Sequence, residues 1–320
     1  MKKKMIMGIL ALAAWFSVSN PLVASYIGKM KMGAVPALKQ EDPLVQQIRK
    51  NAPKYEIPPS DAKLDPIWKA IPGYNGLSVN ILSSYKRMKK AGTFNEEKLV
   101  FTQTKPKVHL QDLPPAPIYK GHPEKPMVSF AINVAWGNEY LSSILATLKK
   151  HNITVSFFLE GNWVKKNPEL AKMISASGQE IGNHSYYHSD MKRLSAEGTR
   201  QELIKTNDVI KAVTGKKCEW FAPPSGSFRD ETIQIAHKLN MKTIMWTVDT
   251  IDWQKPTPET IISRVTRKIQ NGSIVLMHPT DSTAKSLDRL ITLIEKKNLS
   301  IGTISELMKE DRIIENESKK

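Results

Sequence analysis

The sequence predicts an α/β protein, built as a distorted (β/α)7 barrel preceded by a small α+β module. Two observations support this prediction. From residue 127 onward, short apolar runs typical of strands alternate with helical segments, which is the pattern of a parallel sheet with crossover helices. Polar side chains also recur directly after these runs, where the carboxyl ends of barrel strands carry chemistry. An open doubly wound sheet is the alternative. The sequence has no G-x-G-x-x-G motif or P-loop, so nucleotide binding has no support.

Seven strand-like runs define the barrel, at residues 128–134, 154–160, 179–183, 218–222, 242–248, 273–278 and 299–302. Start and stop signals mark the helices between them. Asn167-Pro168-Glu169 places a capping side chain, a proline and an acid at a helix start, and Gly178 is a C-terminal cap signal. Thr257-Pro258-Glu259 starts another helix that ends near Gly272. The barrel is therefore expected over residues 127–306, followed by a charged C-terminal tail at 307–320.

The N-terminus resembles a targeting segment. Lys2, Lys3 and Lys4 precede the apolar run Met5 to Val18, and the small residues Ala24 and Ser25 follow. Residues 1–25 are therefore expected to be a signal peptide or, alternatively, an uncleaved membrane anchor. Either places the rest of the chain outside the cytoplasm, secreted or anchored at the cell envelope.

The segment before the barrel divides by composition. Residues 26–61 are polar and contain prolines, as in a linker. Turn signals, two strand-like runs and one helical run predict the small α+β module at 62–110. The proline-rich stretch 111–126 is expected to be a stiff connector.

The formal net charge of +16 favours an anionic partner, such as a cell-wall polymer or the anionic envelope surface. No basic cluster interleaved with aromatic residues occurs, which argues against nucleic acid. Cys218 is the only cysteine, so the chain forms no internal disulfide and no cysteine-based zinc site. We expect Cys218 to be buried and inert. The sequence does not indicate an oligomeric state.

The candidate site residues follow the predicted strands. Asn133 and Val134 end the first strand, and "HSYYH" follows the third, placing His184 and His188 four residues apart, a spacing that allows both imidazoles to bind one metal. Asp190 and the amide oxygen of Asn133 are candidates for a further ligand.

"TVDTIDW" follows the fifth strand, and His278 follows the sixth. His278 is open to three interpretations, a core histidine, a general acid or a substrate contact, and an acid such as Asp249 is a candidate to orient its imidazole. Asp252 is open to two interpretations, a turn or helix cap or a member of the site. Trp253 is either a core residue or a platform that stacks on a sugar.

These motifs together resemble the polysaccharide deacetylase family, the NodB-homology or carbohydrate esterase 4 group, over about residues 127–306. "HSYYH" is similar to the family's H-[ST]-x-x-H motif, and "TVDTIDW" and "IVLMHPT" are similar to the later motifs. The resemblance implies metal ligation by His184 and His188 and catalytic roles for His278, Asp249 and Asp252. It also implies substrate contacts by Trp253, Leu276, Pro223 and Ser225.

The chain departs from the family pattern at three positions. The family's T-F-D-D-G motif carries a catalytic base and a metal ligand where this chain has Asn133 and Val134, and its arginine position holds Ala222. An amide has no basic site near neutral pH and valine cannot ligate, so both the base and one ligand are missing. Loss of one general base costs ~10²–10⁴ in rate. We therefore expect zinc or another divalent metal to bind weakly or not at all.

The resemblance implies an exported deacetylase-like protein whose glycan partner is peptidoglycan or a chitin-like polymer and whose catalytic site is degenerate. The alternative is a non-catalytic glycan-binding or scaffolding protein. The variant "NVAWG" is similar to deacetylase-like members of spore-forming bacilli, which adds the spore compartment as a candidate location.

Overall fold

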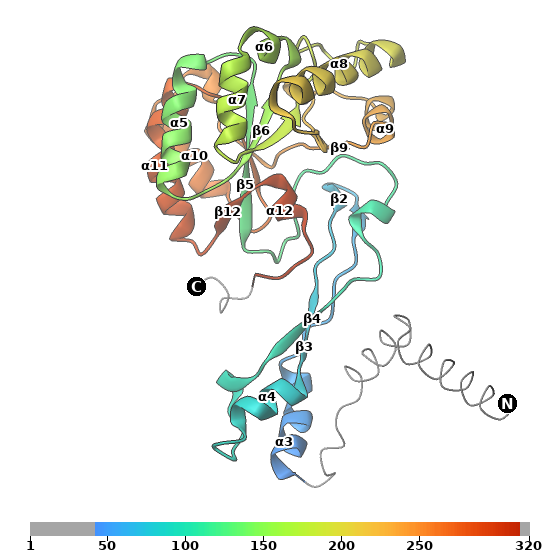
Figure 1. Cartoon of the computed structure of the whole chain (residues 1–320), viewed down its shortest axis with the longest axis vertical. Helices are drawn as coiled ribbons and strands as arrows, with labels where there is room; N and C mark the ends of the chain where they lie inside the picture. The colour runs from blue at the N-terminus through green and yellow to red at the C-terminus, as the bar shows by residue number, and fades with distance from the viewer. Residues whose placement is uncertain (1–41, 314–320) are drawn as a thin grey trace, which may run out of the picture. The chain divides into compact units, whose positions relative to one another are not determined.

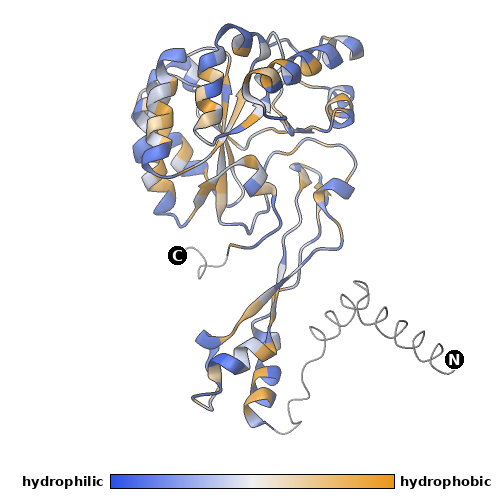
Figure 2. Ribbon diagram, in the orientation of Figure 1, coloured by the Kyte–Doolittle hydropathy of each residue, from blue (hydrophilic) through white to orange (hydrophobic). Residues whose placement is uncertain are grey.

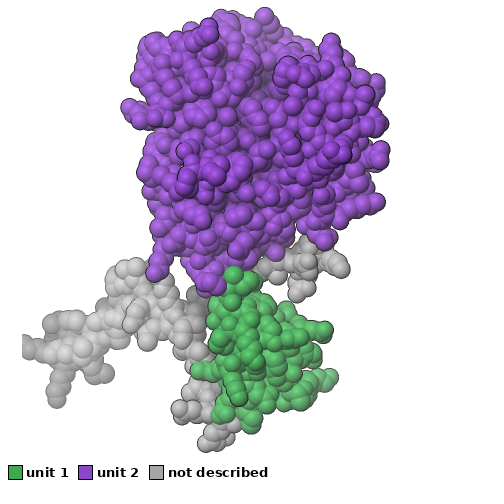
Figure 3. All heavy atoms as spheres, turned by 180° about the vertical axis from the view of Figure 1, so that it is seen from behind, with its two compact units in different colours: residues 1–57, 77–102 green, residues 58–76, 103–320 purple. Residues whose placement is uncertain are grey.

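A computed structural model describes residues 42–313 and divides the chain into two compact units, shown in two colours in Figure 3. The predicted signal or anchor segment, residues 26–41 of the predicted linker and residues 314–320 of the charged tail lie outside the described residues. Among residues 42–313, no helix has the length and apolar character needed to cross a membrane.

The smaller unit contains residues 42–57 and 77–102 of the described chain. Its elements are α3 (Pro43–Asn51), η1 (Ala52–Lys54), β3 (Gly76–Val79), α4 (Ile81–Met88), η2 (Glu96–Lys98) and β4 (Phe101–Thr104), and β3 pairs with β4. Its core consists of apolar side chains from both helices and both strands, among them Leu44, Val45, Ile48, Val79, Tyr85, Met88 and Leu99.

Helix α3 corrects the prediction of a linker over residues 26–61. The carboxylate of Asp42 accepts a hydrogen bond from the Leu44 N–H at 3.0 Å, and Pro43 occupies the first helical turn. Leu44, Val45 and Ile48 then bury one face of the helix. The polar composition of the segment concealed this helix, because a single short apolar stripe is enough to anchor it.

The module also has different limits from the predicted 62–110. Residues 58–76 and 103–126 belong to the larger unit, where they form the hairpin β1 (Lys63–Asp65) and β2 (Lys69–Ile71) and the turn η3 (Leu110–Asp112). Ile118, in the predicted connector, pairs with Ile244 of the barrel and is almost fully buried. The connector is thus fastened to the barrel by backbone hydrogen bonds. Composition alone could not reveal this, because the partners are more than 100 residues away.

The larger unit is the predicted α/β barrel. Its strands are β5 (Met127–Val134), β6 (Ser156–Leu159), β7 (Glu180–Asn183), β8 (Trp220–Phe221), β9 (Lys242–Thr243), β10 (Val248–Asp249), β11 (Ile274–Met277) and β12 (Ser300–Gly302). They pair in parallel in the order β10-β11-β5-β6-β7-β8-β9, and β12 pairs with the start of β5.

The strand predicted at 242–248 is split into β9 and β10, which pair at opposite ends of the sheet order. Ile244 N–H bonds to the carbonyl of Phe221 in β8, whereas Thr247 N–H bonds to the carbonyl of Ile274 in β11. One chain segment therefore supplies both ends of the sheet order. An open doubly wound sheet, whose two edges come from different segments, is excluded by this connection.

Helices surround the strands (Figure 1). They are α5 (Asn138–Lys150), α6 (Gly161–Lys166), α7 (Pro168–Ala176), α8 (Ala196–Thr214), α9 (Asp230–Lys238), α10 (Pro258–Lys268), α11 (Asp281–Glu295) and α12 (Ile304–Met308), with short turns η4 (Pro224–Gly226) and η5 (Asp252–Gln254). Figure 2 shows apolar strands at the centre and hydrophilic outer helix faces. This is the two-layer burial pattern expected for a barrel.

Alternation along β5 determines which of its side chains reach the barrel interior. Val128, Phe130, Ile132 and Val134 all belong to the hydrophobic core shared with the helices. Asn133 lies between two of these positions, so its side chain projects from the opposite face of the strand. Cys218 is buried as expected, and burial raises the pKa of its thiol to about 12.

Candidate functional site

The parallel register brings the ends of neighbouring strands to one level. Val134 pairs with Leu159, Leu159 pairs with Asn183, and Asn183 pairs with Phe221. The loops that follow these strands enclose a cavity of about 390 Å³. It is lined by Asn133, Ala135, Trp136, His184, His188, Ser225, Trp246, Asp249, Trp253, Leu276 and His278. Eight of the predicted site residues therefore line one cavity at the carboxyl end of the strands.

Asn133 lies at the position where the family pattern has its base. Its side chain is 4% exposed, and its Oδ1 is buried without a hydrogen-bond partner among the described residues. A buried amide oxygen without a partner costs about 1–3 kcal/mol, so this atom needs a donor. The cavity it lines is where that donor can come from.

Val134 does not line the cavity. It is fully buried in the hydrophobic core, together with Ile132. The side chain of Val134 therefore contributes to core packing, and the full burial of such a side chain contributes about 1.5–3 kcal/mol.

His184 and His188 come together as predicted, with ring centroids 5.1 Å apart. His184 is fixed by its Nδ1, which donates to the Ala222 carbonyl at 2.7 Å and leaves Nε2 without a proton in the neutral ring. Burial, followed by the neighbouring His188, lowers the pKa of His184 to about 3, and burial also lowers the pKa of His188. Both rings are therefore uncharged at neutral pH, which is the form that binds metals.

No third side chain joins His184 and His188 to complete a metal site among the described residues. Asp190, one candidate, does not line the cavity, because its carboxylate accepts a hydrogen bond from Ser227 and forms an ion pair with Arg193 at 3.2 Å. Among residues 42–313, no three His, Cys, Asp or Glu side chains gather closely enough to bind a metal ion. Catalytic zinc sites use three protein ligands, so the residues here do not fit the family's metal.

His278 lines the cavity and is held by Asp252. The Asp252 carboxylate accepts hydrogen bonds from the ring Nδ1 at 2.8 Å and from the His278 backbone N–H at 2.6 Å. It also accepts one from the hydroxyl of Thr283 at 2.7 Å, and its side chain has no exposed surface. The expectation that Asp249 orients His278 is therefore wrong. Asp249, which lines the cavity, accepts the N–H of Ile251 through Oδ1 at 2.7 Å.

Trp136 stacks on the other side of this pair. Its ring lies almost parallel to that of His278, at 8° and 5.8 Å between centroids. Gly137 makes this possible, because its φ is 81° and a Cβ there would lie 2.0 Å from the Pro279 carbonyl oxygen. The loop after β5 can therefore approach the loop after β11 only with glycine at this position.

Two aromatic residues of the cavity were missed by the sequence analysis, Trp136 and Trp246. Trp136 directly follows the first strand end, and the rule that strand ends carry the site could have identified it. Trp246 was hidden in the predicted strand 242–248. Trp253 lines the cavity as predicted and is 55% exposed, whereas Pro223 does not line it.

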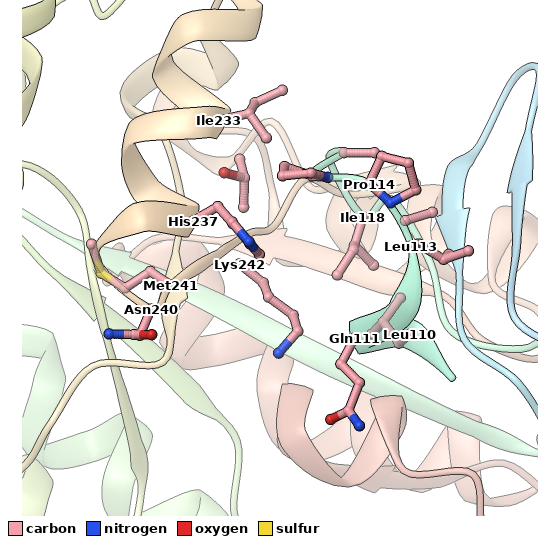
Figure 4. Close-up of a pocket in the computed structure, with 14 residues that line it drawn as sticks. Leu110, Gln111, Leu113, Pro114, Ile118, Ile233, His237, Asn240, Met241 and Lys242 are labelled. Carbon is pink, nitrogen blue, oxygen red and sulfur yellow. The ribbon is translucent and has the colours of Figure 1, made fainter. Parts of the chain in front are cut away.

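A second hollow lies elsewhere on the larger unit, between the connector and α9 (Figure 4). Figure 4 shows Leu113 and Ile118 on one side and Ile233 and His237, from the helix, on the other. Its lining residues are mostly apolar and include no carboxylate. It therefore lacks an acid and base pair, and the strand-end cavity remains the candidate site.

Comparison with known proteins agrees with this geometry. The family model described as polysaccharide deacetylase matches residues 120–244. The chain is 54% identical to the uncharacterised protein YlxY of Bacillus subtilis over 93% of both chains. It is also 29% identical to the peptidoglycan-N-acetylmuramic acid deacetylase PdaA of Bacillus subtilis, over 59% of this chain and 74% of that one.

Among solved structures, the chain resembles wild-type BA3943 of Bacillus anthracis, described as a pseudoenzyme of carbohydrate esterase family 4. The two share 55% identity and a TM-score of 0.81, over 85% of this chain and 97% of that one. A BA3943 mutant described as having restored enzymatic activity matches at 54% identity with the same TM-score, over 84% and 99% of the two chains. These matches, with the barrel and its strand-end site, confirm the predicted resemblance, and the chain belongs to the polysaccharide deacetylase family.

Proposed function

We propose that this protein binds cell-wall glycan in the strand-end cavity without hydrolysing it, outside the cytoplasm at the cell envelope. The observation that carries the proposal is the pair at the end of β5. Asn133 offers an amide where a base is required, and Val134 is packed in the core where a ligand is required. Two uncharged histidines remain, which is too few for a catalytic zinc.

The rest of the cavity supports binding. Trp136 and Trp253 line it and are 45% and 55% exposed, and exposed aromatic rings stack well on apolar sugar faces. A cavity of this size lined mainly by apolar groups with a few polar ones is typical of ligand sites. PdaA, which acts on peptidoglycan, supports a cell-wall glycan as the ligand and a location outside the cytoplasm.

The first test is acetate release from purified peptidoglycan in the presence of zinc. We expect no release by the wild-type protein above background and measurable release by the variant Asn133→Asp/Val134→Asp. The BA3943 mutant with restored activity supports this expectation. Wild-type turnover that the double variant does not exceed would show that the protein is an ordinary deacetylase.

The second test is co-sedimentation with purified peptidoglycan sacculi. Trp136→Ala and Trp253→Ala should each reduce the bound fraction, because each removes a stacking surface. Tyr187→Ala is the matched control, since Tyr187 is 62% exposed but does not line the cavity. If all three variants bind like the wild type, the cavity is not the glycan site.

A further inference from the structure

The cavity that replaces the metal site has an unusual inventory of polar groups. Its lining includes no lysine or arginine and one carboxylate, Asp249, together with three histidines. The family arginine is replaced by the buried Ala222, and nearby Arg264 directs its guanidinium to the carbonyl of Thr250. The cavity wall therefore carries one carboxylate and no lysine or arginine to pair with it.

Its lining includes three hydrogen-bond acceptors that have no donor among the described residues. Asn133 Oδ1 is buried and unpartnered, and His184 keeps Nε2 free because its Nδ1 donates to Ala222. Asp249 accepts the Ile251 N–H through Oδ1, and its Oδ2 has no hydrogen-bond partner among the described residues. A metal ion would be bound through the lone pairs of such groups. A cation with several N–H donors can be bound by the same lone pairs, which then accept hydrogen bonds.

From this inventory we propose that the cavity binds the ammonium group of a de-N-acetylated amino sugar in preference to the acetamido group of an acetylated one. The proposal rests on the proposed function, since it specifies which form of the glycan is held. An alkylammonium has three donors and one positive charge, which match three acceptors and one carboxylate. An acetamido group supplies only one N–H donor. It also adds a carbonyl oxygen, and the cavity wall offers neither a metal nor a charged donor to bind it.

Binding an ammonium group would remove two unfavourable features of the cavity, an unpaired amide oxygen and an unpaired carboxylate. The unpaired Oδ1 of Asn133 gains a donor, and the carboxylate of Asp249 gains a counter-charge in a partly enclosed site, where ion pairs are screened less than at the surface. The aromatic wall formed by Trp136 and Trp253 adds a cation–π contribution for a charged sugar. The chain would then recognise glycan that a deacetylase has already processed.

Calorimetry with two soluble probes tests this. The full chain is titrated at pH 6 and physiological ionic strength with a glucosamine tetrasaccharide and with its fully N-acetylated counterpart. We expect the glucosamine form to bind about tenfold more tightly, the effect of one added charge-assisted hydrogen bond. Asp249→Asn should abolish this preference, while its amide oxygen still accepts the Ile251 N–H and the fold is checked by thermal melting.

Asp208→Asn is the matched control, because Asp208 is exposed on α8 and the variant carries the same net charge as Asp249→Asn. It should keep the preference, which excludes a general charge effect in this basic protein. Equal affinities, tighter binding of the acetylated probe, or a preference that survives in Asp249→Asn would overturn the ammonium site and leave glycan binding standing. No binding of either probe would overturn both proposals.

Discussion

The buried carboxylate of Asp252 holds His278 at two points, the ring Nδ1 at 2.8 Å and the backbone N–H at 2.6 Å. Only the Nε2 edge of the ring is then left to the cavity. A catalytic acid in a deacetylase and a ligand contact in a binding protein need the same positioning. The Asp252–His278 pair is therefore compatible with both catalysis and ligand binding. The residues at the end of β5, Asn133 and Val134, decide between these two roles.

Removing the carboxylate should destabilise the fold more than removing one of its donors. Asp252→Ala leaves two N–H groups and the Thr283 hydroxyl unpaired and should lower the free energy of unfolding by about 3–5 kcal/mol. Thr283→Val removes one donor and should cost about 1–2 kcal/mol. Urea titration of the two variants measures the difference. Equal losses would mean that the Asp252–His278 pair contributes no more than the contact to Thr283.

Zinc should bind the wild-type protein weakly and the double variant Asn133→Asp/Val134→Asp more tightly, because Asn133→Asp adds a carboxylate to the cavity wall that holds His184 and His188. In EDTA the double variant should unfold at a lower temperature than the wild type, because Val134 is fully buried and an aspartate there is an unpaired buried charge. Excess zinc should reverse this loss, since a ligand that binds only the folded state stabilises it.

Adding His184→Ala to the double variant provides the control for this prediction. Zinc should no longer raise its melting temperature, because one of the two imidazole ligands is gone. Tight, stoichiometric zinc binding by the wild-type protein, abolished by His184→Ala, would contradict the missing-ligand interpretation.

His184 should make the protein sensitive to acid. Burial lowers its pKa to about 3 from the ordinary 6.5, so between these values the unfolded chain binds a proton that the folded chain does not. Stability contributed by the neutral ring is complete above pH 6.5 and falls by about 1.4 kcal/mol per pH unit as the pH drops towards 3.

Denaturant titrations between pH 6.5 and 4 measure this slope. His184→Gln, which keeps a donor for the Ala222 carbonyl, should reduce it by close to one proton. The same change at the exposed His237 is the matched control. A slope that His184→Gln does not change would assign the acid sensitivity to other groups.

Lys125 should give a pH dependence of the same sign at alkaline pH. Its ammonium is buried and donates to the carbonyls of Glu306 at 2.6 Å and Lys309 at 2.7 Å, and burial lowers its pKa to about 8 from 10.5. Between pH 8 and 10.5 the folded chain releases a proton that the unfolded chain keeps, so this group makes stability rise by up to about 3 kcal/mol.

The change is measured by chemical denaturation at pH 7.5 and 10, comparing Lys125→Met with Lys205→Met. Lys205 is an exposed lysine of α8. Lys125→Met should remove the rise and also lower stability near neutral pH, because two carbonyls at the end of α12 lose their donor. An identical pH response in the two variants would contradict the buried position of Lys125.

Much of the larger unit could be predicted because its signals are local. The alternation of strands and helices, the helix starts after Asn167 and Thr257 and the apolar character of β5 all lie within short windows of sequence, although the Asn167 side chain makes no capping hydrogen bond. The convergence of His184, Asp249 and His278 also followed, since parallel strands place their carboxyl ends together. The α3 helix and the limits of the small module were missed because contacts distant in sequence decide them.

The sequence by itself determined the family, the barrel and the absence of a base and a ligand at Asn133 and Val134, since these depend on residue type and order. Only the tertiary structure decided that Val134 faces the core, that Asp252 and not Asp249 holds His278, and that Trp136 covers this pair. The reason is geometric. The direction of a side chain at a strand end depends on strand pairing and on close loop contacts, such as Gly137 against Pro279, between segments far apart in the chain.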